Sequence, residues 1–181
     1  SSSEASFLGG AATSASVGYP IGITAPTCCP SGIGRTFFNS ASSKKLIEEI
    51  VETARFAPSW KNTQIVRYLV VDDKEKIAAI ANSKCTYGFD YNIKAIAGAP
   101  AVVILTFVEG RSGFDKDGSF STSKGTGWEM FDAGIAAMTF SLAAYDKGVG
   151  SCIMGVFDDA KVADVIGLEE GKTVAALIPI G

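Results

Sequence analysis

The stretch ARFAPSWKNTQIVRYLVVDD, residues 54–73, changes character twice within a short distance. It opens on the apolar end of a predicted helix, crosses the polar loop APSWKNTQ, and finishes in a β-branched run, residues 65–71, that predicts a buried strand. Pro58 ends the helix, because proline lacks a backbone N–H and its ring clashes with the preceding turn. An ordinary turn could join the two elements. A turn alone gives no reason for Trp60 to stand beside two amide side chains.

Regular elements extend on both sides of this stretch. Upstream, apolar residues recur at three- and four-residue spacing, which predicts one buried helix face with Ser42 or Ser43 as the N-cap. These apolar residues are Leu46, Ile47, Ile50, Val51 and Ala54. Downstream, residues 74–82 predict a short helix, and residues 99–108, APAVVILTFV, predict a central strand.

The strongest periodicity lies further along the chain. Large apolar residues step by 3, 4, 3, 4 and 3 positions, which predicts a helix of about twenty residues that ends at Gly148 and Gly150. The stripe consists of Trp128, Phe131, Ile135, Met138, Leu142 and Tyr145. One interpretation is a core helix. Alanines fill the positions between, however, so a second face is apolar as well, and a helix with two apolar faces lies in a large core or is shared with a second subunit. A chain of this size favours the shared interface.

A long polar loop and three further elements complete the pattern. Residues 109–127 contain five glycines, and a loop of that length is more often functional or mobile than merely connecting. Residues 151–156 predict a strand, residues 158–167 a helix capped by Asp158, and residues 173–180 a strand. Because a buried strand is an unusual place for a protein to end, we expect the native sequence to continue beyond Gly181.

Composition narrows the class of protein. The chain has 181 residues, 47% hydrophobic and 19% charged, with a net charge of −3, which suits one globular domain and excludes the basic excess of a nucleic-acid-binding protein. No apolar run is long enough to span a membrane, and the N-terminus lacks the features of a secretory signal, so we expect a soluble, cytoplasmic protein. Residues 1–34 are rich in Ser, Ala and Gly and form a separate segment of unknown role.

The chain contains no histidine. This absence excludes Ser-His-Asp and Cys-His nucleophile systems, histidine metal sites and histidine acid-base catalysis. The cysteines, Cys28, Cys29, Cys85 and Cys152, show no C-x-x-C spacing, and we predict no metal site. The glycine pairs do not follow a predicted strand and open a helix, so no dinucleotide fingerprint is present. These features alone do not name a reaction.

Three segments, in the right order, resemble the flavin-dependent nitroreductase family. The first, RTFF…LIEEIVETARFAPSWKNTQIVRYLVVDD, is similar to that family's arginine-aromatic element, helix, APS..N.Q loop and strand. The second, YNIKAIAGAPAVVIL, is similar to its short helix that leads into a central strand. The third, MFDAGIAAMTFSLAAYDKGVGSCIMGVFDDAKVADVIGL…ALIPIG, matches its D.G.A…L.A…GLG….G.FD pattern. Together the segments cover residues 35–181, which we assign as one nitroreductase-like domain.

The resemblance implies a fold and an activity. The fold is α+β, with a central, mixed but mainly antiparallel sheet flanked by helices in an α/β/α sandwich, in a homodimer with a long helix at its interface. The activity is that of an FMN-dependent oxidoreductase, which takes hydride from NADH or NADPH and reduces nitroaromatics, quinones or flavins in ping-pong fashion. Isoalloxazine chemistry also accounts for an enzyme without histidine.

The resemblance also implies site residues. Five loop residues match positions that line the flavin, and of these Asn62 and Gln64 are expected to reach it across the dimer interface; the five are Pro58, Ser59, Trp60, Asn62 and Gln64. Asn92 and Lys94 resemble the polar pair at the pyrimidine edge, where a lysine would stabilise charge on reduction. Gly155 and Val156 fall where backbone N–H groups face N5 and O4.

The FMN phosphate has few predicted partners. Arg35 matches the last basic residue of the family's R.S.R element, but Ser31 and Ile33 occupy the two preceding positions, and no basic tail follows the last strand. Because charge-assisted contacts supply much of phosphate affinity, either a further tail completes the site or flavin is held weakly. One alternative on the same fold is a flavin-binding protein without turnover. The weak phosphate site also favours a second alternative, a non-enzymatic dimeric interaction module. The electron acceptor and the choice between NADH and NADPH are not determined by the sequence.

Overall fold

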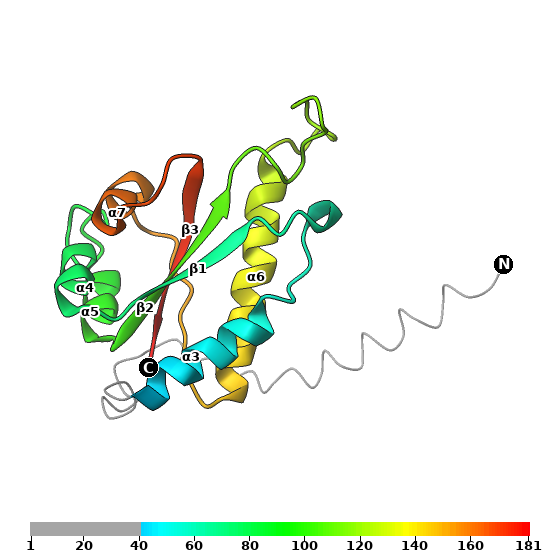
Figure 1. Cartoon of the computed structure of the whole chain (residues 1–181). Coiled ribbons are helices and arrows are strands. Elements are labelled where there is room, and N and C mark those ends of the chain that lie inside the picture. The colour runs from blue at the N-terminus through cyan, green and yellow to red at the C-terminus, as the bar shows by residue number, and fades with distance from the viewer. Residues whose placement is uncertain (1–40) are drawn as a thin grey trace, which may run out of the picture.

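The computed structural model describes residues 41–181 (Figure 1). Arg35, Cys28, Cys29 and the predicted N-terminal segment therefore lie outside the described residues. The elements follow in the order α3 (Ala41–Ala54), η3 (Trp60–Asn62), β1 (Val66–Val71), α4 (Lys74–Ile80), α5 (Asp90–Gly98), β2 (Ala101–Val108), α6 (Gly127–Asp146), α7 (Asp159–Ile166) and β3 (Lys172–Ile180). Each helix and strand predicted from periodicity is present, except the strand at residues 151–156.

The three strands form one sheet with β2 at its centre. Both neighbouring pairs are antiparallel, with Leu69 opposite Ile104 and Ile104 opposite Leu177. No parallel pair occurs among residues 41–181. Every residue of β2 from Ala101 to Phe107 is buried, as a nearly continuous run of apolar and β-branched residues predicts for a strand covered on both faces.

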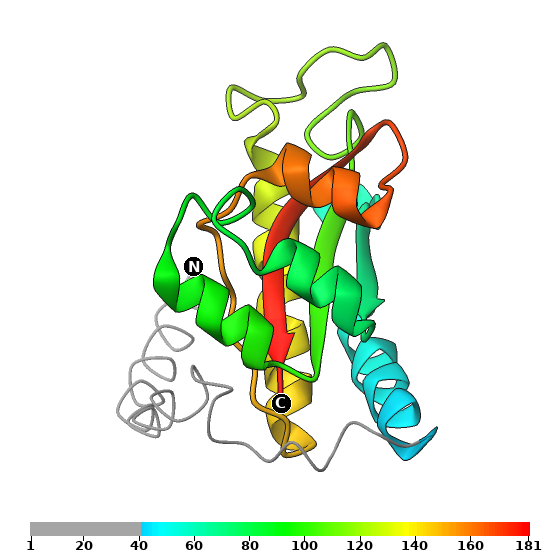
Figure 2. The same cartoon turned by 90° about the vertical axis from the view of Figure 1, so that its left-hand side faces the viewer.

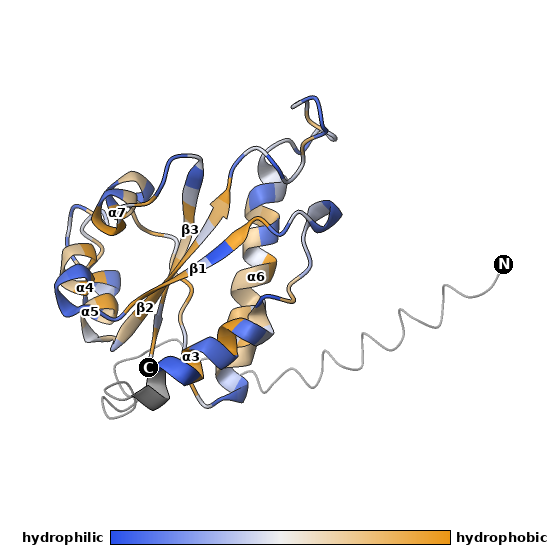
Figure 3. Cartoon of the chain, in the orientation of Figure 1, coloured by the Kyte–Doolittle hydropathy of each residue, from blue (hydrophilic) through white to orange (hydrophobic). Residues whose placement is uncertain are grey.

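Helices cover both faces of this sheet. Along β2, Val103 and Leu105 point into a core shared with α3 and α6, whereas Val102 and Ile104 point into a core shared with α4, α5 and α7. Figure 2 shows α4, α5 and α7 in front of the sheet and α6 behind it. In Figure 3 the central strand is orange over most of its length, while α3 alternates between blue and orange, as expected for a helix with one buried face. The predicted α/β/α sandwich is confirmed.

Strand β1 differs from the prediction in its burial. It lies at the edge of the sheet, where Leu69 and Val70 are 38% and 41% exposed. A β-branched run predicts a strand, but it does not reveal how many neighbours the strand has, because that depends on segments elsewhere in the chain. The prediction of a fully buried strand is therefore wrong for β1.

The strand predicted at residues 151–156 is not formed as a regular strand. This segment lies antiparallel to β3 but makes only two isolated bridges, Ser151 to Ile180 and Met154 to Leu177. Between them the N–H of Cys152 donates to the carbonyl of Pro179 at 3.2 Å. Pro179 cannot return the bond, because proline has no N–H, so the ladder is interrupted at this point.

Helix α6 has the predicted length, and of its two apolar faces one is buried and the other is exposed. The buried face carries alanines and the fully buried Phe140, which stacks on Tyr68 with 5.6 Å between ring centroids. The stripe of large residues faces outward instead, with Phe131 58% and Leu142 56% exposed. The small side chains let α6 approach the sheet closely, and the large ones remain without a cover in the single chain.

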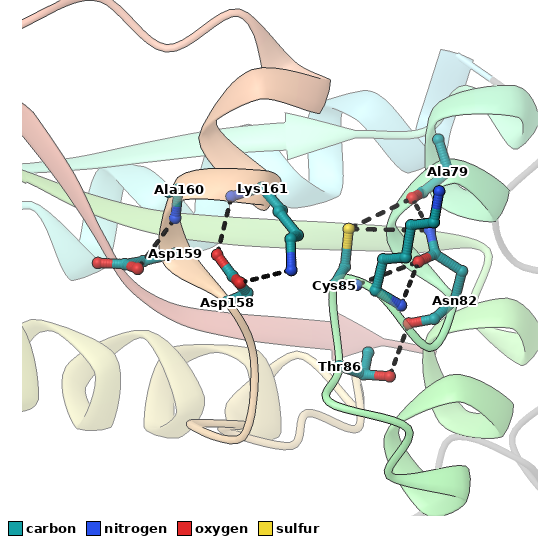
Figure 4. A network of polar contacts seen from close by, with 9 residues as sticks. Ala79, Asn82, Cys85, Thr86, Asp158, Asp159, Ala160 and Lys161 are labelled. Carbon is teal, nitrogen blue, oxygen red and sulfur yellow. Dashed lines mark hydrogen bonds and ion pairs between the residues drawn. The ribbon is translucent and has the colours of Figure 1, made fainter.

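The predicted cap of α7 is confirmed, and that of α3 is wrong. Asp158 accepts a hydrogen bond from the N–H of Lys161 at 3.1 Å and pairs with its ammonium at 2.9 Å. The N–H of Asp158 donates to the carbonyl of Cys85 at 2.7 Å, which ties α7 to the turn before α5. Figure 4 shows the contacts between Asp158 and Lys161, with the turn that holds Cys85 nearby. Ser42 and Ser43, in contrast, already lie within α3, so neither precedes the helix as an N-cap.

Candidate functional site

The polar loop of residues 58–64 has an unusual backbone. Lys61, Asn62 and Gln64 all have positive φ angles, of 44°, 55° and 50°, although none of them is glycine. The N–H of Gln64 donates to the hydroxyl oxygen of Ser59 at 2.8 Å, and the N–H of Asn62 donates to the carbonyl of the same residue at 3.0 Å. Left-handed residues cost energy and cluster at functional sites, where the surrounding structure holds them in place.

A buried carboxylate holds the start of this loop. Both oxygens of Asp132, on α6, accept from the N–H of Trp60, at 3.0 and 3.1 Å. One of them also accepts from the hydroxyl of Ser112 at 2.6 Å, and Asp132 is 2% exposed. The N-terminal end of η3 is therefore fixed to the long helix by a charge-assisted contact.

The Trp60 ring packs against the beginning of α6. Its centroid lies 4.3 Å from that of Trp128, and Trp128 in turn contacts Phe131 edge-on at 5.4 Å. The indole N–H of Trp128 donates to the hydroxyl of Thr122 at 2.8 Å. The tryptophan that a simple turn would not need thus forms the link between the loop and the outer stripe of α6.

Two polar atoms of the loop are buried without a partner among the described residues. They are the indole nitrogen of Trp60 and the hydroxyl oxygen of Thr63. The side chains of Asn62 and Gln64 are exposed and share one hydrogen bond of 3.3 Å. Buried donors are rarely left unpaired, so these groups fit a bound molecule that offers hydrogen-bond acceptors.

A cavity of about 300 Å³ lies against the loop, between α3, β1 and α6. Ser59, Gln64, Tyr68 and Asp132 contribute to its wall, together with Arg55 at the end of α3. Burial raises the pKa of Tyr68 to about 12, so this phenol stays neutral, and its hydroxyl donates to the carbonyl of Ala136 at 3.1 Å. The loop therefore borders a space of a size typical for small-molecule sites.

The remaining predicted residues form a second group. Asn92, on α5, is buried, and its amide donates to the carbonyl of Val156 at 3.0 Å. Gly155 and Val156 are exposed next to it, and so is Lys94. Figure 1 shows η3 beside α6 on one side of the sheet and α5 on the other. Among the described residues, no hydrogen bond joins this second group to the loop of residues 58–64.

The long loop of residues 109–127 also contacts the loop of residues 58–64. Lys61 pairs with Asp115 at 2.9 Å, and its ammonium lies 3.4 Å from the hydroxyl of Ser121. Hydrogen bonds from Ser121 and from Lys61 lower the pKa of Asp115. The sequence marked this loop as functional or mobile, and in the structure it lies against the candidate site.

Glu129 is a second buried acid on α6, 5% exposed, and one of its oxygens accepts from the N–H of Gly110 at 2.7 Å. Burial raises the pKa of this carboxyl above its ordinary value of 4.5. The folded state then favours the protonated form of Glu129. This carboxyl therefore stabilises the fold below pH 4.5, and the contribution is lost as the pH rises through the raised pKa. Glu129→Gln is expected to remove this loss, since glutamine keeps the oxygen acceptor without the charge.

The measurement is urea unfolding of both proteins between pH 4 and pH 8. The free energy of unfolding of Glu129→Gln, relative to the wild type, is expected to rise with pH over the lower part of this range and then level off. A difference that stays constant with pH would contradict the account.

Sequence reasoning missed Asp132 and Ser112 as site residues, and it also missed Glu129, the buried acid one turn before Asp132. A signal was present, because Asp132 and Glu129 are the only charged residues of α6 before its last residue, Asp146. They stand one turn apart in a helix that is otherwise apolar, and charges at such positions are retained only with partners. Their partners lie far away in the sequence, which is why the pattern alone did not identify them.

Comparison with known families agrees with the resemblance seen in the sequence. The sequence model of the nitroreductase family matches residues 34–86 and 89–181. The chain belongs to the nitroreductase family. None of the curated proteins compared with it matches. The resemblance inferred from the three segments is thereby confirmed over nearly the same residues.

Solved structures of this family share the fold. A nitroreductase family protein from Streptococcus pneumoniae TIGR4 is 25% identical, with a TM-score of 0.64, over 80% of this chain and 82% of the other. An FMN-dependent nitroreductase from Clostridium difficile R20291 is 24% identical, with a TM-score of 0.59, over 76% and 75%. A protein from Exiguobacterium sibiricum 255-15, solved in complex with FMN, is 20% identical, with a TM-score of 0.62, over 80% of each chain.

Residues 41–181 contain neither a membrane-spanning helix nor a cluster of metal ligands. No helix in this range is both long and apolar enough to cross a membrane. The same range has no cluster of three or more His, Cys, Asp or Glu side chains that could bind a metal ion.

Proposed function

We propose that the chain binds FMN and acts as an FMN-dependent NAD(P)H oxidoreductase that reduces nitroaromatics, quinones or flavins by a ping-pong mechanism. The observation that carries this proposal is the loop of residues 58–64. It combines three left-handed residues, an anchor on Asp132 and two buried polar atoms without partners among the described residues. It also occupies the APS..N.Q position of the family pattern. Of the solved structures with the same fold, one is an FMN-dependent nitroreductase and another is a complex with FMN.

The residues of the loop suit the edge of a flavin ring. The ring carries carbonyl and nitrogen acceptors along its pyrimidine edge, and the indole nitrogen of Trp60 is a donor. The amides of Asn62 and Gln64 can both donate and accept. When bound, FMN accepts hydride from the nicotinamide and passes electrons to the acceptor. The protein supplies orientation and hydrogen bonds, which require no histidine.

The second group of residues serves the same ring in this proposal. The exposed backbone of Gly155 and Val156 can offer N–H groups to N5 and O4, a role that depends on main-chain position alone. Asn92 fixes that position, because its amide holds the Val156 carbonyl from α5. Lys94, exposed nearby in the sequence, would place positive charge close to the pyrimidine edge, where negative charge develops on reduction.

Two copies of the chain are needed to bring both groups to one flavin. The loop lies on the α6 side of the sheet and α5 on the other, so a single chain presents them as separate surfaces. The outward stripe of α6, with Phe131 and Leu142 more than half exposed, offers an apolar face for a second copy. A homodimer that packs along α6 is therefore part of the proposal, with the loop of one chain reaching the flavin of the other.

A second candidate function follows from the phosphate element. Arg35 is the only basic residue of the R.S.R pattern, with Ser31 and Ile33 at the other two positions. With so few cations the chain could hold flavin without turnover, or could have kept the dimeric scaffold as an interaction module. Measurements of flavin binding and of flavin reduction distinguish these functions.

Asn62→Gly is expected to weaken FMN binding at least about tenfold, the loss typical for one polar contact to a bound molecule. Glycine is the sharper substitution, because Asn62 has a φ angle of 55° that glycine adopts without strain, whereas alanine would also distort the loop. The measurement is quenching of FMN fluorescence on titration with protein. Lys76→Ala, an exposed change on α4, serves as the control and should bind FMN as the wild type does. Equal affinities for Asn62→Gly and the wild type would count against a flavin contact at this loop.

A further inference from the structure

The first two turns of α6 hold two buried carboxylates, and each binds a different segment of chain. Glu129 accepts from Gly110, at the start of the long loop. Asp132, one turn later, accepts from Trp60 in the loop of residues 58–64 and from Ser112 in the long loop. Asp132 is therefore the point at which both loops and α6 meet.

The position of Asp132 is unfavourable for a charge. It is 2% exposed, and among residues 41–181 no lysine or arginine forms an ion pair with it. An unpaired carboxylate is retained in such surroundings only if neutral donors satisfy its oxygens. The N–H of Trp60 and the hydroxyl of Ser112 fill that role here, so the three residues depend on one another.

The strain of the loop explains why an anchor is needed. Lys61, Asn62 and Gln64 are all left-handed, and such a backbone persists only where its surroundings fix it. Asp132 binds the N–H of Trp60, directly before these residues. At the surface, the Lys61–Asp115 ion pair is the second connection between the two loops, but it is exposed and contributes little by itself.

We propose that Asp132 is a positioning residue of the flavin site: it holds the backbone at Trp60 so that the following amides point outward, and it couples this loop to the loop of residues 109–127. This inference rests on the proposed function for its flavin part. The coupling of the two loops is a property of the protein without flavin, so the two parts can fail separately.

The test compares Asp132→Ala and Asp132→Asn with Glu129→Gln, the matched change of a buried acid on the same helix that does not contact Trp60. Amide hydrogen exchange and near-UV circular dichroism are recorded on flavin-free protein, and the dissociation constant of FMN is then measured. The near-UV spectrum is specific, because Trp60 and Trp128 are the only two tryptophans and their rings lie 4.3 Å apart.

Asp132→Ala is expected to speed exchange of the Trp60 N–H at least about tenfold, to change the tryptophan dichroism and to weaken FMN binding by a similar factor. Asp132→Asn keeps one oxygen acceptor, so its exchange rate should fall between those of the wild type and Asp132→Ala. Glu129→Gln should leave the Trp60 exchange rate within about twofold of the wild type.

Three outcomes are decisive. Unchanged Trp60 exchange in both Asp132 variants would overturn the inference. Faster exchange in both loops with unchanged FMN affinity would overturn the flavin part and support the coupling. Faster exchange in both loops of a protein that binds no FMN at all would remove the proposed function while leaving the coupling intact. If Asp132→Ala does not fold, Ser112→Ala replaces it, because this change removes one donor to the same carboxylate. Amide exchange should then become faster in both loops. Faster exchange confined to residues 109–127 would overturn the coupling.

Discussion

Phe131→Glu is expected to convert the protein to a monomer and to abolish detectable FMN binding. Phe131 lies on the outward stripe of α6 and is 58% exposed, so the folded chain tolerates a charge there. In a homodimer that packs along α6, the same carboxylate would be buried against an apolar surface without a partner, which opposes association by several kcal/mol. Because each flavin needs groups from two chains in this account, loss of the dimer removes the site as well.

Light scattering coupled to gel filtration gives the mass, and fluorescence titration gives the FMN affinity. Val70→Glu is the control, because Val70 is 41% exposed on β1, outside the stripe of α6, and receives the same new charge. Circular dichroism should show both variants folded. A dimeric Phe131→Glu protein would place the subunit interface elsewhere, and a monomer that binds FMN normally would contradict a site built from two chains.

Phe140→Ala is expected to lower the free energy of unfolding by about 3–5 kcal/mol, the range for truncating a buried aromatic side chain. Phe140 is fully buried, stacks on Tyr68, and is the one large side chain on the alanine face of α6. The surrounding alanines are too small to move into the space that it leaves. Urea unfolding measures this change in the free energy of unfolding. The loss of stability should appear with or without flavin.

Phe56→Ala provides the matched control for this prediction. Phe56 is 75% exposed, so the same truncation should change the free energy of unfolding by less than about 0.5 kcal/mol. A small effect at Phe140 would mean that the alanine face of α6 is not the packed core described here.

Helix α6 connects the outward stripe, where a second chain is proposed to pack, with the loop of residues 58–64. Phe131 points outward into the stripe offered to a second chain, and the next residue, Asp132, points inward to the loop of residues 58–64. Trp128, one turn earlier, contacts both Phe131 and Trp60. A partner that packs on the stripe would therefore press on the same turn of helix that fixes the loop, so assembly and flavin binding are expected to support each other.

Local patterns were sufficient for elements whose signals lie within the element. Asp158 caps α7, as the sequence predicts, and Gly167 ends the helix in a left-handed conformation with a φ angle of 66°. The failures among the strands involve partners distant in sequence. The strand expected at residues 151–156 is interrupted by Pro179 on β3, and the exposure of β1 follows from its place at the sheet edge.

In the candidate site, too, local signals were read from the sequence and distant partners were not. The loop of residues 58–64 stood out because Trp60 and two amides are unusual in a turn, and the family resemblance then assigned it to the flavin. Its anchor was not predicted, because Asp132 lies 72 residues from Trp60 and only the folded chain brings them together. The second group gains a structural role that sequence did not suggest, since Asn92 binds the Val156 backbone.

Anaerobic reduction of the FMN-loaded protein is the decisive experiment for an oxidoreductase. Addition of NADH or NADPH is expected to bleach the visible absorption of bound flavin, and a quinone, added afterwards, should restore it. Bound FMN that stays oxidised with both nicotinamides would contradict the oxidoreductase and identify a flavin-binding protein. A protein that takes up no FMN at all would contradict the flavin site itself.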